Sequence, residues 1–526
     1  MYTLISILFS VALTQTGVGE VEWRYKTDGT VSSPAIGTDY CIYFTTNYYR
    51  FLVGIEASLY ALKPDGSLKW HNDLKKGTEF SSLPNNYFNS IDNNTNSPNT
   101  QNTFPTEGVE TTSPLLGTDG TLYLCIMSRK AGYSYGYAYA ANSTSGLPKW
   151  LNELVSRNSL VAWARDCRPP AIGPDTNLYF FTSIGLLNKW NKLHSLNPDS
   201  IINWSSVMYL NTAPVIGANG TLYYGSTNTL HALDPSGTKK WSANFTARLS
   251  EPALNSDSML YVGTANHFLH AVNCKNGTKI WSFNTKELTV GSPIVGFNNT
   301  VYVIAKDTVS SCLYAINNDG SEKWRYKADT NLLMTDPTIA ANGVIYVGLY
   351  GKKSPHPILC AIDSTGKLSW KCNLDDNPTY ISTPVIGPTG TVYVGTNHYI
   401  HAVKASAPLA NSSWPMLRHD LSRTGCIKGS GVGAVKEDNL PSDKYTNAFL
   451  SLEAVILSGE ITIGYSLPQN EAGKIGIYNI LGQKLFETSV IASGKTKLNL
   501  TLPNGIYFIL LKSNSSSVSS KLIVTR

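Results

Sequence analysis

Four histidines occupy the same position of a short recurring pattern. The pattern reads LHSL, LHAL, LHAV and IHAV, and its histidines are His194, His231, His270 and His401. Imidazole is a common ligand of zinc, so a set of this kind could suggest a metal site. Other copies of the pattern carry tyrosine or cysteine there, and equivalent positions of separate repeat units lie far apart. We therefore expect these histidines to pack or to form hydrogen bonds.

The cysteines form no recognisable redox or metal motif. The eight cysteines are scattered and stand at positions 41, 125, 167, 274, 312, 360, 372 and 426. No C-x-x-C, no C-x-x-C-H and no adjacent pair occurs, which argues against a zinc knuckle, a dithiol redox site and covalent c-type haem. An even number of cysteines permits disulfides in an exported protein but does not specify their pairing.

Other chemical motifs are also missing from the sequence. There is no G-x-S-x-G elbow, no phosphate-binding loop and no H-E-x-x-H pair. The net charge is +6, from 42 Lys and Arg against 36 Asp and Glu, and no basic run of five or more occurs. A nucleic-acid partner is therefore not expected. Without a catalytic constellation, an enzyme is the less favoured interpretation.

A repeat of about 45 residues must position any site in this chain. Its anchor prolines are Pro34, Pro114, Pro170, Pro214, Pro252, Pro293, Pro337 and Pro384. Each unit holds four short apolar runs joined by turn sequences such as Asn219-Gly220 and DPSG (234–237). Alternation and β-branched or aromatic residues predict strands in these runs. Four strands in each of eight units predict an all-β, eight-bladed β-propeller.

Tryptophan marks the end of the fourth run in seven units. These residues are Trp70, Trp150, Trp204, Trp241, Trp281, Trp324 and Trp370. The eighth unit stops at IHAV (400–403) without one, and Trp23 in VEWRY stands at the other end of the chain. We expect the N-terminal strand to complete the last blade, which would close the ring and pair its edges. The eight tryptophans are predicted to pack blade against blade.

LYALKPDGSLKW (59–70) and SPAIG (33–37) resemble the pyrroloquinoline-quinone-like repeats of quinoprotein-type propellers over residues 20–426. WPMLRHDLSRTG (414–425) is similar to a segment that often follows the last blade there. The family includes quinone-dependent alcohol dehydrogenases, a bacterial outer-membrane assembly lipoprotein and non-enzymatic exported proteins. The resemblance would require an adjacent disulfide and a Glu/Asn/Asp calcium set for quinone binding. No adjacent cysteine pair exists and no persuasive calcium set aligns, so no quinone cofactor is expected, and calcium remains open.

Insertions in the repeat concentrate in the second-to-third strand connections and in the links between units, which share one face of a propeller. Examples are 47–58, 128–137 and 151–168, and such a face often binds a partner. The predicted ligand-binding residues of this aromatic and basic rim are Tyr49, Arg50, Arg129, Tyr133, Tyr135, Trp163, Arg165, Lys189 and Trp190. Aromatic residues with arginine suit a protein or glycan partner. The alternative is ordinary loop decoration.

The N-terminal residues predict export. TLISILFSVAL (3–13) is too short for a transmembrane span and suits a signal peptide over residues 1–19. The alternative is a buried N-terminal strand. Residues 427–450 are rich in Gly, Ser, Lys and Asp and are predicted to form a linker.

Residues 451–526 contain alternating strands separated by Gly, Asn and Pro turns, which predict a small antiparallel β-sandwich. YNILGQ (478–483), NGIY (504–507) and KLIV (521–524) resemble the C-terminal sorting domain of the type IX (Por) secretion system. The resemblance implies recognition by that machinery, passage through the periplasm and delivery to the cell surface or medium. The alternative is an Ig-like adhesion or spacer module.

These observations favour an exported binding or scaffold protein that acts through the elaborated rim. Two alternatives remain open. One is an enzyme that is quinone-dependent or acts on polysaccharide, and the other is a purely structural surface protein.

Overall fold

The computed structural model describes most of the chain. The described residues are 17–50, 54–74, 108–130, 133–158, 164–184, 191–208, 210–255, 258–351, 354, 356–374, 376, 380–427, 451–457, 460–466, 472–479, 483–490, 494–498, 505–513 and 517–524. The chain divides into two compact units, Met1–Val435 and Lys436–Arg526. Within the described ranges the secondary structure is β, apart from the short 3-10 turn η3 (Phe297–Asn299). No helix in these ranges has the length and apolarity that a membrane crossing would need.

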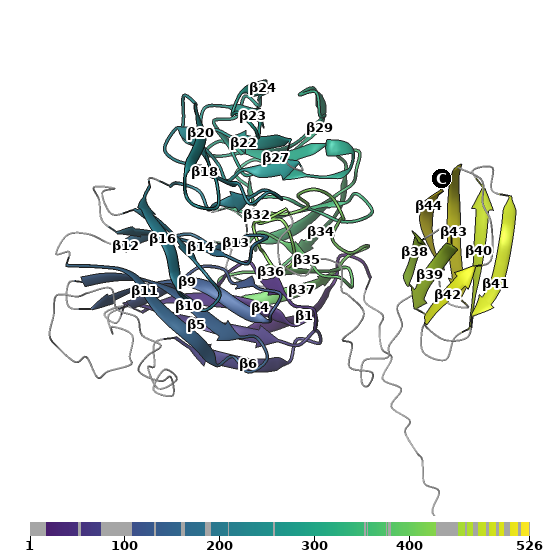
Figure 1. Cartoon of the computed structure of the whole chain (residues 1–526), viewed down its shortest axis with the longest axis horizontal. Coiled ribbons are helices and arrows are strands. Elements are labelled where there is room, and N and C mark those ends of the chain that lie inside the picture. Colours follow the sequence, from purple (N-terminus) through teal and green to yellow (C-terminus); the bar gives the residue numbers. More distant parts are fainter. Residues whose placement is uncertain are drawn as a thin grey trace, which may run out of the picture. The chain divides into compact units, whose positions relative to one another are not determined.

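The described part of the first unit contains eight antiparallel sheets of four or five strands (Figure 1). The first holds β2 (Thr30–Val31), β3 (Ala35–Ile36), β4 (Ile42–Arg50), β5 (Gly54–Leu62) and β6 (Leu68–Asp73). The second holds β7 (Gly108–Thr111), β8 (Leu115–Leu116), β9 (Thr121–Lys130), β10 (Tyr133–Asn142) and β11 (Pro148–Asn158). The third holds β12 (Ala164–Cys167), β13 (Ala171–Ile172), β14 (Leu178–Ile184), β15 (Lys192–Leu196) and β16 (Ile202–Val207).

The remaining sheets of this unit follow the same meander. The fourth holds β17 (Val215–Ile216), β18 (Leu222–Gly225), β19 (Thr229–Leu233) and β20 (Lys239–Asn244). The fifth holds β21 (Ala253–Asn255), β22 (Met259–Gly263), β23 (Phe268–Asn273) and β24 (Lys279–Asn284). The sixth holds β25 (Thr289–Val290), β26 (Ile294–Val295), β27 (Val301–Lys306), β28 (Ser311–Ile316) and β29 (Glu322–Lys327). The seventh holds β30 (Leu333–Met334), β31 (Thr338–Ile339), β32 (Ile345–Tyr350), β33 (Ile358–Ile362) and β34 (Leu368–Asn373).

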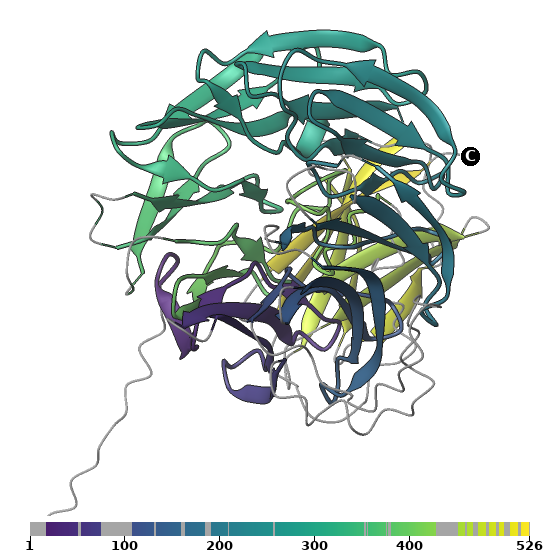
Figure 2. The same cartoon turned by 90° about the vertical axis from the view of Figure 1, so that its left-hand side faces the viewer.

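The eighth sheet joins the two ends of this unit. It holds β35 (Val385–Ile386), β36 (Thr391–Gly395), β37 (Tyr399–Lys404) and, at its edge, β1 (Val21–Lys26). Strand β1 runs antiparallel to β37, with Trp23 opposite Ala402 and Tyr25 opposite Ile400. Figure 2 shows the first unit's sheets following one another around a centre, with the purple first strands beside the green last strands.

Each meander depends on residues suited to tight turns. In the fourth sheet, the Asp234 carboxylate accepts hydrogen bonds from the backbone N–H groups of Ser236 and Thr238, both at 3.0 Å. Gly237 in the same turn has φ +84°, a conformation that strains residues with a side chain. These features agree with the turn prediction made for DPSG.

Every repeat tryptophan contacts two sheets. Within its own sheet each indole lies against a tyrosine, with ring centroids 5.7–6.1 Å apart, as in Trp241–Tyr223 and Trp370–Tyr346. Seven indole N–H groups donate to a backbone carbonyl in the third-to-fourth strand turn of the following sheet, at 2.9–3.0 Å. The eighth, Trp370, lies against Gly19, just before β1. The tryptophans therefore bridge neighbouring sheets.

A segment after β37, residues 408–427, crosses the inner strands of the sheets, and we call it the hub segment. Its backbone carbonyls accept hydrogen bonds from residues in the innermost strands of six sheets, namely Ile36, Leu116, Ile172, Ile216, Val295 and Ile339, at 2.8–3.1 Å. Trp414 and Met416 of this segment are buried. The hub segment thus satisfies inner-strand N–H groups that would otherwise lack partners.

Cysteine states differ along the first unit. Cys125 is disulfide-bonded. Six others are free and buried, namely Cys41, Cys274, Cys312, Cys360, Cys372 and Cys426.

The second unit contains two antiparallel sheets in its described residues. One has the order β38 (Ser451–Leu457), β39 (Glu460–Ser466), β42 (Gly494–Leu498). The other has the order β41 (Lys484–Val490), β40 (Gly473–Asn479), β43 (Gly505–Ser513), β44 (Ser517–Val524). Ile475, Ile477, Ile509 and Leu511 are fully buried. Alternating apolar residues of β40 and β43 therefore supply the buried face of the second sheet.

Candidate functional site

The insertions that the sequence places between the second and third strands of the first two sheets continue as paired strands in their described residues. Residues 47–58 lengthen β4 and β5, which pair from Ile42–Leu62 up to Arg50–Gly54. Residues 128–137 lengthen β9 and β10 in the same way, with Arg129 opposite Ser134. The physical reason is that the two strands of each hairpin continue to satisfy one another's backbone groups, so the extra residues extend the ladder.

Only some of the predicted rim residues lie in the described part of the chain. Tyr49, Arg50, Arg129 and Tyr133 lie at the outer ends of these hairpins, and Arg165 lies on β12, but their side chains are outside the described set. Trp163, Lys189 and Trp190 lie outside the described residues altogether. Tyr135 is half-buried and stacks on Tyr137, with ring centroids 6.0 Å apart. The rim therefore stays a prediction.

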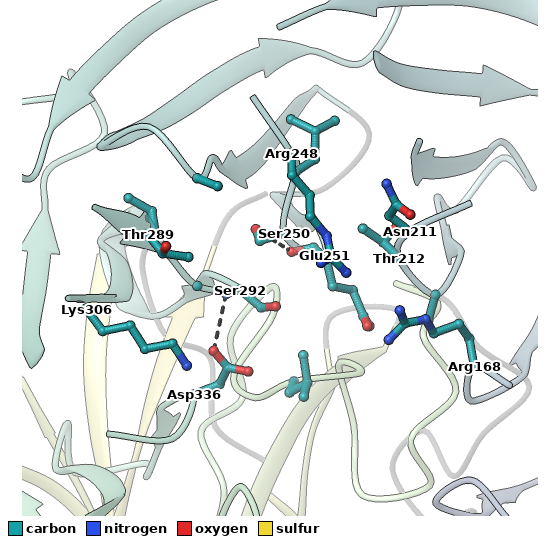
Figure 3. A pocket seen from close by; sticks show the side chains of 16 residues that line it. Arg168, Asn211, Thr212, Arg248, Ser250, Glu251, Thr289, Ser292, Lys306 and Asp336 are labelled. Atoms are coloured by element: carbon teal, nitrogen blue, oxygen red, sulfur yellow. Dashed lines mark hydrogen bonds between the residues drawn. The ribbon is translucent and has the colours of Figure 1, made fainter. Parts of the chain in front are cut away.

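A charged cavity of about 470 Å³ lies among the segments that link the third to the seventh sheet (Figure 3). Its lining comprises Arg168, Asn211, Thr212, Ala213, Arg248, Leu249, Ser250, Glu251, Ala265, Thr289, Val290, Gly291, Ser292, Lys306, Asp336 and Leu417. Most of these residues lie within the four positions before an anchor proline, where the chain enters the innermost strand of a sheet. Leu417 belongs to the hub segment.

Two carboxylates of this pocket depart from the repeat. The residue directly before the anchor proline is Ser, Thr, Ala or Pro in six units, but it is Glu251 in the fifth and Asp336 in the seventh. Asp336 accepts a hydrogen bond from the Ser292 N–H at 3.2 Å, and burial raises the pKa of its carboxyl to about 6. Nearby Lys306 acts in the opposite direction and favours the charged form of Asp336.

Two residues before the anchor proline, the third unit has a cation where most units have a hydroxyl. In six units a Ser or Thr there accepts a hydrogen bond from a second-strand N–H, as Thr212 does from Gly225 at 2.8 Å and Ser250 from Gly263 at 2.9 Å. The third unit has Arg168 at this position and the sixth has Gly291. Arg168 therefore replaces a structural hydroxyl with a long cation that lines the pocket.

Two further cations reach this pocket without a partner in the described part of the chain. Neither the Arg248 guanidinium nor the Lys306 ammonium forms a hydrogen bond or ion pair there. Arg248 is exposed and Lys306 is partly exposed. Figure 3 shows both side chains directed into the cavity with Arg168, Glu251 and Asp336. The pocket thus presents three cations and two carboxylates to a ligand.

A buried arginine lies behind the pocket wall. Arg418 of the hub segment is 1% exposed and donates to the carbonyl oxygens of Pro170 and Pro214 and, at 3.2 Å, to Glu251 Oε1. Its guanidinium therefore ties the entries of the third, fourth and fifth sheets together and orients the Glu251 carboxylate. Charge-assisted hydrogen bonds of this kind are the stronger ones in proteins.

Comparisons with known proteins agree with both modules. Residues 190–308 and 269–407 match the family of the outer membrane protein assembly factor BamB, and residues 457–525 match the secretion system C-terminal sorting domain. The chain carries BamB-type repeats and a C-terminal sorting domain. The resemblances drawn from the repeat and strand motifs are therefore confirmed, and the sorting domain indicates secretion to the cell surface.

One curated relative and two solved structures are similar over parts of the chain. Quinoprotein alcohol dehydrogenase PedH of Pseudomonas putida is 31% identical over 139 residues, which cover 25% of this chain and 21% of that protein. The chain thus spans about a fifth of the curated relative it matches. BamB from Moraxella catarrhalis has a TM-score of 0.46 at 13% identity, over 73% of this chain and 99% of that one. The computationally designed Ika8 protein has a TM-score of 0.46 at 10% identity, over 72% and 97%.

The residues of this chain do not fit the quinone site that its resemblance to dehydrogenases would imply. The sequence has no adjacent cysteines to form the required disulfide. In the described ranges, no three His, Cys, Asp or Glu side chains converge as metal ligands. Glu251 and Asp336 are instead set among three cations. We therefore derive no chemistry through a quinone or a metal here.

The four repeat histidines contact hydroxyl groups of their own sheets. His194 Nδ1 lies 2.8 Å from Ser205 Oγ, and His270 Nδ1 lies 2.7 Å from Ser282 Oγ. His231 and His401 contact Ser226 and Thr396 in a similar way. Burial lowers the pKa of His194 to about 3 and that of His270 to about 4. These contacts are of the packing and hydrogen-bonding kind that the repeat pattern predicts.

Sequence reasoning placed the inserted link 151–168, which ends at Arg168, on the rim but missed Arg248, Glu251, Lys306 and Asp336. A signal was present in the sequence. Aligning the eight anchor prolines shows charged residues at positions that otherwise hold Ser, Thr, Ala, Pro or Gly. That alignment would have identified Arg168, Glu251 and Asp336. It would not have found Lys306, which lies at the end of β27.

Proposed function

We propose that this protein is an exported eight-bladed β-propeller, closed by β1, that binds an acidic ligand in the charged pocket at the cell surface. The proposed modules are a signal peptide (1–19), the propeller (20–426), a linker (427–450) and a sorting β-sandwich (451–526). Residues 1–16 and 428–450 lie outside the described residues. The sorting domain supports export by the type IX machinery, with the periplasm as the proposed route.

The contacts between sheets support a closed ring. Each of the first six tryptophan-bearing sheets reaches the next through an indole N–H. Trp370 of the seventh sheet contacts Gly19 beside the eighth, and Trp23 of the eighth donates to Pro64 of the first at 3.0 Å. With these contacts each of the eight sheets has two neighbouring sheets, which is the arrangement expected of a propeller.

The observation that carries the binding proposal is the departure of pocket residues from the repeat. At the pocket, Arg168 replaces a hydroxyl that binds a backbone N–H in other units, and Glu251 and Asp336 replace the Ser, Thr, Ala or Pro found before the anchor proline elsewhere. Charged side chains at these positions are not explained by the structural requirements of the repeat, which other units meet with small residues. Their concentration in one cavity favours a ligand-binding site over a purely structural role.

The charges indicate the class of ligand. Arg168, Arg248 and Lys306 would bind a carboxylate or sulfate group, because guanidinium and ammonium groups are donors without acceptors. The carboxylates Glu251 and Asp336 would accept hydrogen bonds from hydroxyl groups. Acidic glycans combine both features. The predicted rim of Tyr49, Trp163 and Trp190 would then contact neighbouring sugars, since aromatic faces suit glycans.

Binding to an array of acidic and neutral glycans tests this function, with the double variant Arg248→Ala/Lys306→Ala as the probe of the pocket. Neither side chain has a described partner, so the fold should tolerate the change. Lys323→Ala, an exposed lysine on β29, is the matched control. We expect wild type and control to bind acidic glycans and the double variant to lose at least tenfold in affinity. Binding of only neutral glycans, or equal binding by all three proteins, would refute the proposed pocket, whereas binding of none would favour a structural protein.

Polysaccharide cleavage is a second candidate, favoured by the two carboxylates of the pocket. Asp336, with its raised pKa, could act as the general acid, and Glu251 supplies the second carboxylate of the pocket. Release of reducing ends from an acidic glycan that the wild type binds, abolished by Asp336→Asn, would support cleavage. Binding without release would limit the protein to recognition.

A further inference from the structure

Unsatisfied buried polar atoms concentrate in one short stretch of the hub segment. Among the described residues, eleven buried side-chain nitrogen or oxygen atoms have no hydrogen-bond partner. Five of them belong to residues 418–423, namely Arg418 Nε, His419 Nδ1, Ser422 Oγ, Arg423 Nε and Arg423 Nη1, although His419 Nδ1 lies 3.4 Å from Asp420 Oδ2. Most buried polar groups in proteins are paired, so such a concentration calls for a missing partner.

Arg423 has two buried nitrogen atoms without a hydrogen-bond partner, more than any other residue of this stretch. Its side chain is 3% exposed, and burial followed by the charge of Arg418 lowers its pKa to about 10. Arg423 is therefore still charged at neutral pH. A buried charge without a partner is strongly unfavourable. Because Arg418 is also buried, at 1% exposed, the stretch places two cations in the interior.

The nearest carboxylates are already engaged. Asp420 accepts hydrogen bonds from the Thr424 N–H at 3.0 Å and the Thr424 hydroxyl at 2.7 Å. Glu251 accepts from Arg418 Nη1 at 3.2 Å and also lines the pocket. Both carboxylates lower the electrostatic cost of Arg423, but neither forms a hydrogen bond with its guanidinium in the described contacts.

The backbone holds these side chains in unusual conformations. Arg418, His419 and Arg423 have φ values of +69°, +75° and +60°. Positive φ costs free energy in residues other than glycine and persists only where the surroundings impose it. Here the imposing contacts are the hydrogen bonds between the hub segment and six inner strands. The guanidinium groups are thus held in place before any partner binds.

We propose that the hub segment binds a small inorganic anion between the guanidinium groups of Arg418 and Arg423. The unpaired guanidinium atoms are all donors, so the partner must be an acceptor. A water molecule could accept the same hydrogen bonds, and the measurements below distinguish water from an anion. Because both arginines are buried, the anions to test are small ones, namely halides and tetrahedral oxyanions. This anion site is separate from the ligand proposed for the pocket and does not depend on it.

Bound anion would stabilise the folded chain. A ligand that binds only the native state raises stability by RT ln(1 + [L]/Kd), and the gain follows a binding curve. General salt effects are instead shared by all anions at equal ionic strength. The two cases can therefore be separated by exchanging anions while ionic strength is constant.

The test measures the thermal unfolding temperature of the full chain in sodium gluconate, with chloride, bromide or phosphate substituted stepwise. We expect a saturable rise with at least one of them, and its identity distinguishes a halide from an oxyanion. Arg423→Met should lose this rise, whereas Arg325→Met, which removes an exposed arginine on β29, should keep it. An equal response of wild type and Arg423→Met would overturn the proposal.

A second measurement uses wild-type protein alone. It applies if the anion binds too tightly to be exchanged, or if Arg423→Met does not fold. Wild-type protein is exchanged into gluconate, denatured, and its released ions are quantified by ion chromatography. About one equivalent of chloride, phosphate or sulfate supports the site even where the unfolding temperature does not respond. A flat unfolding temperature with no released anion overturns it. Bromide-soaked crystals then locate the anion, and anomalous peaks that occur only outside the hub segment would also refute the site.

Discussion

Trp370 lies over Gly19, two residues before strand β1, so the seventh sheet contacts the segment that leads into the eighth. A Cβ atom at Gly19 would stand 2.9 Å from the indole ring. The same relationship recurs in other turns, where Trp23 covers Gly66 and Trp241 covers Gly277. Glycine is required at these positions because the indole occupies the space of a side chain.

Gly277→Ala is therefore expected to destabilise the protein by about 2–4 kcal/mol, combining positive-φ strain with a Cβ placed 2.6 Å from the Trp241 ring. Gly343→Ala is the matched control, because Gly343 has φ +83° but its Cβ would meet only Ser364, at 3.3 Å. Chemical denaturation of both variants measures the difference. Equal losses would mean that the backbone conformation alone requires glycine.

Trp241→Ala is expected to lower the free energy of unfolding by about 3–5 kcal/mol, the range for a buried aromatic side chain. The indole is 9% exposed, packs on Tyr223 and donates to the Cys274 carbonyl at 2.9 Å. Trp241→Phe keeps an aromatic ring and removes the hydrogen bond, so it should cost less. Denaturant unfolding measures both, and a loss below about 1 kcal/mol for the alanine variant would rule out a packed bridging role.

Acid should destabilise the first unit through its buried histidines. The pKa of His194 falls to about 3 in the folded chain, against 6.5 for an unperturbed histidine. The unfolded state therefore binds a proton first, so stability is complete above pH 6.5 and is lost as the pH falls toward 3. At pH 5 the preference of the unfolded state for the proton on His194 lowers the free energy of unfolding by about 2 kcal/mol relative to neutral pH. His194→Asn should unfold with a smaller loss of stability between pH 7 and pH 5 than wild type, and identical pH profiles would contradict the prediction.

Deletion of residues 451–526 should leave the first unit folded and keep the protein in the periplasm. The two compact units have separate cores, and the sorting domain match lies within the deleted residues. Cell fractionation with protease accessibility measures the location, and tryptophan fluorescence checks folding. Normal surface delivery of the truncated protein would disprove the sorting role.

Much of the fold follows from short-range patterns in the sequence. Turn pairs such as Asn219-Gly220 and the alternation of TVYVG (391–395) predict strands whose partners are close in sequence. The all-β class and the repeat family are confirmed, and the eight-bladed closure stays a prediction supported by the pairing of β1 with β37. The rim stays a prediction, and hairpin pairing extends into the described residues of two of its insertions.

The site was harder to predict because its residues are distant in sequence. Arg418 donates to Pro170 and Pro214, which are 248 and 204 residues away. No local pattern records such a contact, and WPMLRHDLSRTG was noticed only for its resemblance. Lys306 follows an ordinary strand. Only the meeting of five sheets shows that these charges share a cavity.

The pairing of β1 with β37 also has a consequence for how the chain is made. Residues 21–26 are synthesised early, yet their partner strand ends at Lys404. The eighth sheet therefore cannot assemble until nearly four hundred further residues have emerged, and closing so long a loop carries a large entropic barrier. During that interval the first strand has no native neighbour to pair with, so its exposed edge is open to pairing with other chains.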